Sequence, residues 1–169
     1  MSQDGDTSSK HARTAKKLTA SELRRLSEFR FQLRRFLHFS QQAAEKVGLR
    51  AQQHQLLLAV FGMPEGTAPT IAAVADRLLL KHNSTVELVD RTIEQGLLRR
   101  VNDPIDQRRI LLRLTERGEH MLHSLAAFHK EEINATGPEL LRSLRMVLRG
   151  GDSPARPRKA ARSREGVLA

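Results

Sequence analysis

The residues with the most evident chemistry are short hydrogen-bonding side chains at the start of a predicted helix: Asn83, Ser84, Thr85 and Glu87. The spacing of apolar residues predicts that this helix runs from about Ser84 to Gln95 and turns these side chains, together with Arg91, toward solvent. Such groups can donate to and accept from base edges in the major groove of DNA, and a helix N-terminus offers free N–H groups to a phosphate. Ser84 and Asn83 could instead serve only as helix caps.

A second candidate contact lies at the polar turn 102–107, between strand candidates at 97–101 and 109–114. Arg108 is a long cation beside this turn and suits the narrow minor groove, where negative potential is focused. Asp106 is close enough along the chain to hold the guanidinium in a bidentate pair, which would lower the entropy cost of insertion. The alternative is a surface salt bridge worth at most about 1 kcal/mol.

A pair of helices and a hairpin must position these contacts. After a predicted helix over 52–61, Thr70 should cap a short helix whose apolar residues fall at i, i+3, i+4 and i+7: Ile71, Val74, Ala75 and Leu78. The polar run 81–85 then turns the chain into the next helix, which Gly96 ends. Two short helices joined by a tight turn form a helix-turn-helix, and a hairpin directly after it is a wing.

Two further helical regions carry more apolar surface than a small domain needs. A capping box at Thr19–Glu22 opens a long helix that ends at Gly48, and a break at Gly137-Pro138 separates a helix over about 116–135 from one over 138–149. A large exposed apolar stripe usually marks an interface. We therefore expect dimer contacts from Leu26, Phe29, Leu33, Phe36, Leu140, Leu144, Val147 and Leu148. The alternative is that the first helix wraps its own domain.

The amino-acid composition limits the class of partner that the chain is expected to bind. The chain has 169 residues, with 29 Lys and Arg against 19 Asp and Glu, a formal net charge of +10 that favours nucleic acid or an anionic membrane surface. The basic ends, 1–17 and 151–169, lack the apolar residues that would offset chain entropy, so we expect both to be disordered, either solvated or in weak contact with phosphates. With no membrane span or signal peptide in view, we expect a cytoplasmic protein without a membrane partner.

Catalytic and metal-binding functions find little support. The sequence has no cysteine, no glycine-rich phosphate loop, no nucleophile elbow and no zinc-protease motif. Glu119-His120 and His123 place two imidazoles one helical turn apart, but zinc needs a third and usually a fourth ligand. We therefore expect neither an enzyme nor a metal site, and an exposed polar face for these histidines.

From Gly48 to Leu125 the sequence resembles the MarR family of bacterial winged-helix transcriptional regulators. Five blocks in order carry the resemblance: Thr70–Leu78, Ser84–Arg91, Gly96–Arg100, Asp103–Arg109 and Leu114–Gly118. The resemblance implies a mainly α fold over 18–150, with about six helices, a two-stranded β wing, a DNA-binding core at about 50–115, and N- and C-terminal dimerisation helices.

The same resemblance implies that Asp106 and Arg108 are the wing-tip pair. The expected DNA-binding residues are Thr70, His82, Asn83, Ser84, Thr85, Glu87, Arg91, Asp106, Arg108 and Arg109. Glu87 departs from the family, in which many members have Ser or Thr at that position. A carboxylate there would repel phosphate but could accept a hydrogen bond from cytosine N4, so the base preference cannot be taken from a relative.

For function, the resemblance implies a homodimeric, sequence-specific regulator, expected to be a repressor that reads a pseudo-palindromic operator in double-stranded DNA. The family often responds to small aromatic or phenolic ligands, so we expect an effector of unknown identity and no bound cofactor. The alternative is a sequence-independent DNA-coating protein, whose binding would rest on charge alone.

Overall fold

The computed structural model describes residues 17–149, so the disorder predicted for the two basic ends falls, Lys17 apart, outside the described residues. The elements in chain order are α1 (Ala20–Lys46), α2 (Ala51–Phe61), α3 (Ile71–Leu78), α4 (His82–Glu94), β1 (Leu98–Asn102), β2 (Ile110–Leu114) and α5 (Glu116–Leu148). The fold is mainly α with one antiparallel two-stranded sheet, as the sequence predicts. Among the described residues, no helix is both long enough and apolar enough to cross a membrane.

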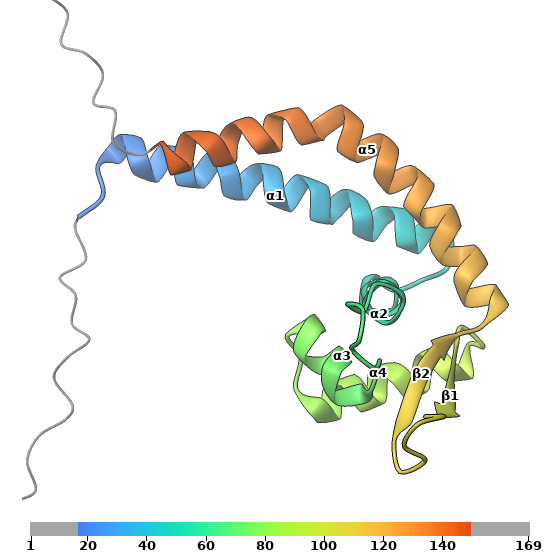
Figure 1. The fold of residues 1–169 in the computed structure, drawn as a ribbon. Helices are drawn as coiled ribbons and strands as arrows, with labels where there is room; N and C mark the ends of the chain where they lie inside the picture. Colours follow the sequence, from blue (N-terminus) through green and yellow to red (C-terminus); the bar gives the residue numbers. More distant parts are fainter. Residues whose placement is uncertain (1–16, 150–169) are drawn as a thin grey trace, which may run out of the picture.

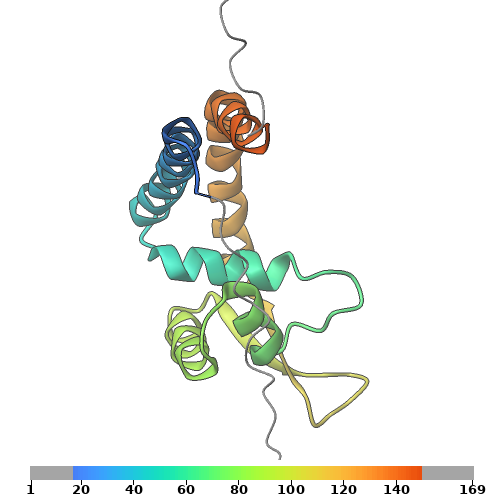
Figure 2. The ribbon, with the colours of Figure 1, turned by 90° about the vertical axis from the view of Figure 1, so that its left-hand side faces the viewer.

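The described chain has two parts. α1 and the C-terminal half of α5 lie side by side and antiparallel, and we call this pair the arm (Figure 1). α2, α3, α4, β1 and β2 gather below the end of the arm where α1 finishes, and we call them the winged part (Figure 1). Figure 2 shows the β1–β2 hairpin extending to one side of the helices, away from the arm. α5 connects the two parts, because it starts directly after β2.

α1 begins and ends where the sequence predicts. The backbone N–H of Glu22 donates to Thr19 Oγ1 at 3.2 Å, and the backbone N–H of Thr19 donates to Glu22 Oε2 at 2.7 Å, which completes the capping box. At the other end, Gly48 has φ +80°, the left-handed conformation that glycine adopts without steric cost.

The winged part has one apolar core to which all five helices and both strands contribute. Its buried side chains include Leu56 and Leu57 of α2, Val74 of α3, Val89 of α4, Leu112 of β2 and Leu125 of α5. In the sheet, Leu98 pairs with Leu114 and Asn102 with Ile110. The backbone N–H of Leu112 also donates to the carbonyl of Pro69 at 2.9 Å, which fixes the hairpin to the segment before α3.

α5 is one continuous helix of 33 residues, so the break predicted at Gly137-Pro138 is wrong, and the described residues form five helices rather than six. Proline removes one N–H donor from a helix, here the donor that would bond the carbonyl of Asn134. Packing offsets that cost, because the part of α5 beyond Pro138 runs along α1 and buries Ser143. The helix curves over its length (Figure 1), as a helix with an internal proline often does.

Some large apolar side chains of α2 and α5 are exposed. Phe61, at the C-terminal end of α2, is 58 % exposed, and its ring meets the ring of His123 edge-on at a centroid distance of 5.9 Å. α2 also buries two polar residues, Gln53 and His54, together with Leu56 and Leu57. Phe128 and Ile133 of α5 are each about half exposed.

Gly118 lies where the first turn of α5 meets the residue before β1. A Cβ added at Gly118 would come within 2.1 Å of the carbonyl oxygen of Leu97, which also accepts the N–H of Thr115 at 3.1 Å. The oxygen cannot move aside without straining that hydrogen bond. We therefore expect Gly118→Ala to lower the free energy of unfolding by about 2–3 kcal/mol in urea denaturation, despite the better helix propensity of alanine.

Glu119→Ala is the matched control, because it places alanine at an exposed position of the same turn. Its free energy of unfolding should stay within about 0.5 kcal/mol of the unaltered chain. A Gly118→Ala variant as stable as this control would contradict the close approach of α5 to Leu97.

Candidate nucleic-acid interface

α3 and α4 form the helix-turn-helix. Thr70 Oγ1 accepts the backbone N–H of Ala73 at 3.3 Å and caps α3 as predicted. α3 ends at Leu79, a non-glycine residue with φ +55°. The turn therefore comprises 79–81, and the turn predicted at 81–85 is wrong, because the backbone N–H of Thr85 already donates to the carbonyl of Lys81 at 3.0 Å, as in a helix.

The first turn of α4 presents His82, Asn83 and Ser84, all of them exposed. The N-cap is Lys81, whose side chain makes no capping hydrogen bond. Asn83 and Ser84 are therefore within the helix, which excludes the alternative that they only cap it. The N-terminus of an uncapped helix carries partial positive charge and unsatisfied N–H groups, so this turn suits a DNA phosphate as well as base edges.

Thr85 is fully buried, which corrects the prediction that it faces outward to contact DNA. Its Oγ1 donates to the carbonyl of Lys81 at 3.1 Å, and its place on the helix is shared by the buried residues Leu88 and Thr92. Thr92 likewise donates its hydroxyl to the backbone, to the carbonyl of Leu88 at 2.7 Å. Because both hydroxyls bond within the helix, the threonines can pack in the core although they are polar.

Glu87 and Arg91 are exposed, as predicted, but the structure separates Arg91 from the first turn. Arg91 lies eight residues beyond Asn83, about 12 Å along the helix axis. It lines a polar hollow of about 190 Å³ together with Arg50 and Gln95. Glu87 is therefore the residue of this pair that shares the N-terminal half of α4 with His82, Asn83 and Ser84.

An ion pair joins α4 to the wing. Arg100 of β1 places its Nη2 2.6 Å from Oδ1 of Asp90 on α4, and both side chains are partly exposed. An exposed pair contributes little to stability, but it adds to the contacts that α4 makes with β1. We infer that α4 and the hairpin approach DNA as one unit.

Asp103, which was not among the predicted site residues, organises the tip of the wing. This carboxylate is buried, with 5 % of the residue exposed. Its Oδ1 accepts the backbone N–H groups of Ile105 at 2.9 Å and Asp106 at 3.4 Å, and its Oδ2 lies 3.6 Å from Arg109 Nη1. An Asx residue before Pro104 is the sequence signal that could have identified it as the anchor of the turn.

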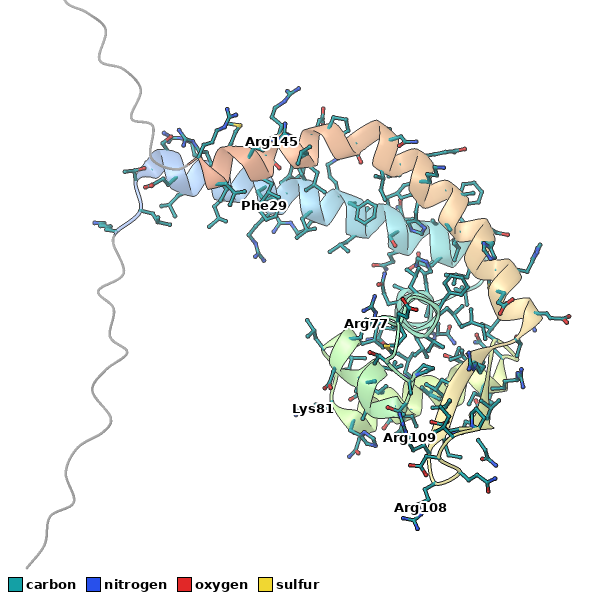
Figure 3. The ribbon with its side chains drawn as sticks, in the orientation of Figure 1. Phe29, Arg77, Lys81, Arg108, Arg109 and Arg145 are labelled. Carbon is teal, nitrogen blue, oxygen red and sulfur yellow. The ribbon has the colours of Figure 1, made fainter. Side chains whose placement is uncertain are left out.

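Asp106 orders Arg108 in a different way from the one predicted. Asp106 Oδ1 accepts the backbone N–H of Arg108 at 3.1 Å, and within residues 17–149 no ion pair joins the two side chains. The predicted bidentate pair is therefore wrong, and it is Arg109 that a carboxylate, Asp103, holds. Figure 3 shows Arg108 directed away from the hairpin tip, with its guanidinium beyond the backbone.

Lys81, a cation on the same side of the winged part as the wing tip, was missed. Figure 3 shows Lys81 on the helices and Arg109 and Arg108 on the wing, on the side that faces away from the arm, whereas Arg77 lies at the level of α2, nearer the arm. Lys81 is exposed.

The histidines near the start of α5 do not form a metal centre in the structure. Within residues 17–149, no group of three His, Asp or Glu side chains is placed to hold a metal ion. His120 and His123 are both exposed, and the ring of His123 contacts Phe61.

The predicted dimer residues are divided between two surroundings. Phe29 and Phe36 of α1 and Leu140, Leu144 and Val147 of α5 are partly buried where the two helices pack. Leu26 and Leu33 of α1, by contrast, are 37 % and 36 % exposed, and Leu148 of α5 is 75 % exposed. Leu23 and Leu37 extend the exposed row on α1. The apolar stripe thus exceeds what the α1–α5 contact covers.

Three buried polar side chains meet where the arm joins α2. The rings of His54 on α2 and His129 on α5 are stacked, with centroids 4.8 Å apart and 13° between the planes. His129 is hydrogen-bonded at both nitrogens, to the carbonyl of Leu125 at 2.7 Å and to Ser40 Oγ of α1 at 2.9 Å, whereas neither nitrogen of His54 has a hydrogen-bond partner among residues 17–149. Burial, and then the neighbouring His129, lowers the pKa of His54 from 6.5 to about 4.

A small cavity lies beside this junction, between α1 and α5. It has a volume of about 150 Å³ and is lined by Phe39, Gln42, Ala43, Lys46, Val47 and Phe128. Phe39 also meets the ring of His129 edge-on at a centroid distance of 6.0 Å. One wall of the cavity is therefore continuous with the histidine pair.

A helix-turn-helix followed by a hairpin with a basic tip defines the winged class of DNA-binding domains. Residues 47–109 match the model of the MarR family. No curated protein matches the chain. Over residues 47–109, which include α2, α3, α4 and β1, the chain is therefore similar to the MarR family.

Solved structures share the fold. AbsC, a MarR family transcriptional regulator from Streptomyces coelicolor, is similar with a TM-score of 0.63 and 21% identity, over 79% of this chain and 93% of that one. CouR from Rhodococcus jostii RHA1, bound to p-coumaroyl-CoA, gives a TM-score of 0.52 at 24% identity, over 70% and 86% of the two chains. A MepR mutant from S. aureus, bound to an oligodeoxyribonucleotide, gives 0.53 at 19% identity, over 76% and 99%.

Proposed function

We propose that this chain is a cytoplasmic, ligand-responsive repressor that binds a pseudo-palindromic operator as a homodimer. The observation that carries the proposal is the exposed face formed by the first turn of α4 and the tip of the wing, with His82, Asn83 and Ser84 on one side and Arg108 on the other. Two such faces related by a two-fold axis would read half-sites about 34–36 Å apart, one turn of the DNA helix.

In this proposal α4 enters the major groove with its N-terminal half. Asn83 and Ser84 have the donor and acceptor groups that distinguish base pairs there, and Glu87 can accept from cytosine N4. Lys81 lies at the edge of this surface and would contact a phosphate beside the groove. Arg108 would enter the adjacent minor groove, where negative potential favours a guanidinium.

Replacing Arg108 by alanine should weaken DNA binding by about 1–3 kcal/mol, because the variant loses a cation from a groove that focuses negative potential. The dissociation constant is measured by fluorescence anisotropy, and sedimentation should show that the oligomeric state is unchanged. Arg117→Ala, which removes an exposed arginine at the start of α5, is the matched control. An Arg108→Ala variant that binds as tightly as this control would remove the wing from the interface.

The homodimer is proposed from the exposed leucines of the arm. Leu23, Leu26, Leu33 and Leu37 occupy one side of α1, and Leu141 and Leu148 are exposed on α5. Single chains rarely leave a contiguous apolar patch of this kind in water, and a second copy of the arm would cover it with the same residue types.

The cavity between α1 and α5 is our candidate for the effector site. Engineered apolar cavities of about 150 Å³ accept benzene, so a single aromatic ring fits this volume. Phe39 and Phe128 offer ring faces, and Lys46 offers a cation at the rim, a combination that suits a small aromatic acid or phenol. CouR, which shares the fold, was solved with an aromatic thioester, p-coumaroyl-CoA.

This assignment is tested with 4-hydroxybenzoate as the probe, in isothermal titration calorimetry. Lys46→Met should weaken binding of the probe at least about tenfold, because it removes a charge-assisted hydrogen bond and keeps the apolar stem. Lys130→Met, at an exposed position of α5, should leave the affinity unchanged. Equal affinities for the unaltered chain and the Lys46 variant would exclude this cavity as the site for an aromatic anion.

The function as a whole is tested by selecting bound duplexes from a random pool with the purified protein. A pseudo-palindromic consensus with half-sites one helical turn apart is the expected result. The selected duplex then competes with a shuffled duplex at physiological salt. Equal binding of the two would favour the sequence-independent DNA-coating protein and overturn the repressor.

A further inference from the structure

A second basic surface lies on the arm, at residues that the DNA interface does not use. Arg142, Arg145 and Arg149 are all exposed and stand at i, i+3 and i+7 on the last turns of α5. In a helix with 3.6 residues per turn, this spacing puts the three on one face, which we call the arginine stripe. The opposite face of the same turns carries Ser143 and Val147 and packs against α1.

The arginine stripe is not neutralised by its own chain. Within residues 17–149, none of the three guanidinium groups takes part in an ion pair. The one acidic side chain of residues 138–149 is Glu139, whose carboxylate lies 3.2 Å from Arg35 of α1 instead. Three adjacent cations repel one another, so an anionic partner would remove an unfavourable interaction as well as add favourable ones.

The side chains of the stripe suit phosphates in particular. All three are arginine, whose planar fork binds a phosphate through two parallel hydrogen bonds, whereas lysine acts as a point charge. The stripe is about 10 Å long, enough to meet successive phosphates of one DNA strand. The sequence beyond it, 150–169, adds five basic and two acidic residues, which continues the positive charge along the chain.

The arginine stripe is too far from the winged part to contact the same DNA duplex. Figure 3 shows Arg145 on the arm far from the wing, whereas Arg108 and Lys81 lie on the side of the winged part that faces away from the arm. A straight duplex that contacts α4 and the wing therefore cannot also contact the arginine stripe. A phosphate partner on the stripe must belong to another molecule.

We propose that the arginine stripe binds the backbone of a second DNA duplex, so that one regulator can bridge two DNA segments. This inference goes beyond the proposed operator binding and rests on it only for the first duplex. The contact is made to phosphates alone, so it should not depend on sequence and should weaken steeply with salt.

The test uses the full chain on a surface that carries the selected duplex. A fluorescent duplex of random sequence is then added at low salt, and its capture is measured. The unaltered chain should capture it, and R142Q/R145Q/R149Q should capture at least about tenfold less, because three phosphate contacts are lost. Binding of the first duplex and the sedimentation coefficient should not change in this variant.

The matched control is R24Q/R117Q/K130Q, which removes three exposed cations outside the leucine row of α1 and changes the net charge equally. It should retain capture of the second duplex. Equal loss in both triple variants would mean that net charge alone attracts DNA and would overturn the stripe as a site. No capture by the unaltered chain would also overturn it.

Two other measurements distinguish a second DNA duplex from other molecules that could cover the arginine stripe. If the stripe variant sediments as a smaller species, the three arginines belong to the subunit interface and the proposal fails. If poly-L-glutamate competes with the second duplex as well as unlabelled DNA does, the surface suits an acidic polypeptide, and the duplex is the wrong partner. If the unaltered chain does not bind the first duplex at all, that result counts against the operator proposal and not against the stripe.

Discussion

Replacing Leu26 and Leu33 together by glutamate is expected to produce monomers and to weaken binding of the selected duplex by at least about 100-fold. Both side chains are about one-third exposed in the single chain, at 37 % and 36 %, and would become buried against a second copy. Two carboxylates buried in that contact would lose their hydration, and no opposite charge would offset the desolvation free energy. A monomer binds only one half-site. In a dimer, binding of one half-site raises the effective concentration of the second subunit at the other half-site, and the monomer lacks this contribution to affinity.

The oligomeric state is measured by sedimentation velocity and the affinity by fluorescence anisotropy. Leu58→Glu is the matched control, because Leu58 is 39 % exposed but lies on α2 of the winged part. This variant should remain a dimer and keep its affinity for DNA. If the α1 double variant still sediments as a dimer, the subunit contact lies on another surface.

Acid should destabilise this protein through His54, by about 3 kcal/mol between pH 6.5 and pH 4. The folded-state pKa of His54 is about 4, whereas the unfolded-state value is 6.5. Above pH 6.5 neither state binds the proton, so the free energy of unfolding does not depend on His54 there. Below pH 6.5 the unfolded state is protonated while the folded state is not, and stability falls with pH until the folded-state pKa is reached.

The measurement is urea unfolding at a series of pH values from 7.5 to 4.5, for the unaltered chain and for His54→Phe. Phenylalanine keeps an aromatic ring against His129 and cannot be protonated, so it should remove most of this acid dependence. It should also be at least as stable at pH 7.5, because within the described part of the chain neither ring nitrogen of His54 has a hydrogen-bond partner to lose. His123→Phe, at an exposed site, should keep the acid dependence of the unaltered chain.

The elements that local sequence specifies were predicted well. The capping box at Thr19, the cap at Thr70 and the glycine ends at Gly48 and Gly96 are all found, because each depends on residues within one or two turns. The hairpin strands were predicted to within one residue at each end for the same reason. Turn chemistry and hydrophobic period act over short distances, and they are visible in a single sequence.

The errors arose where packing between distant segments decides the outcome. Pro138 remains helical because α1 packs along the turns that follow it, and α1 is about a hundred residues earlier in the chain. Thr85 is buried because it shares a helix face with Leu88 and Thr92, which pack against other elements in the core. The buried contact of His54 with His129 joins two helices, and neither residue stands out in its own segment.

The candidate site was predicted in part. Asn83, Ser84, Glu87 and Arg108 are exposed at the positions expected of them. Asp103 was missed because its function depends on backbone N–H groups that only the folded turn brings to its carboxylate. The interaction of Asp106 was assigned to the wrong group of Arg108 for the same reason, since residue spacing does not distinguish a backbone donor from a side-chain donor.

The unbroken course of α5 has a mechanical consequence. A single residue, Thr115, separates β2 from α5, and its Oγ1 both caps the helix and donates to the carbonyl of Gly96 at 2.7 Å. The 33 residues of α5 span about 50 Å, so a tilt of about 5° at one end displaces the other by about 4 Å. Because α5 is continuous and begins directly after β2, we expect a small rotation of the arm to displace the hairpin and the position of Arg108.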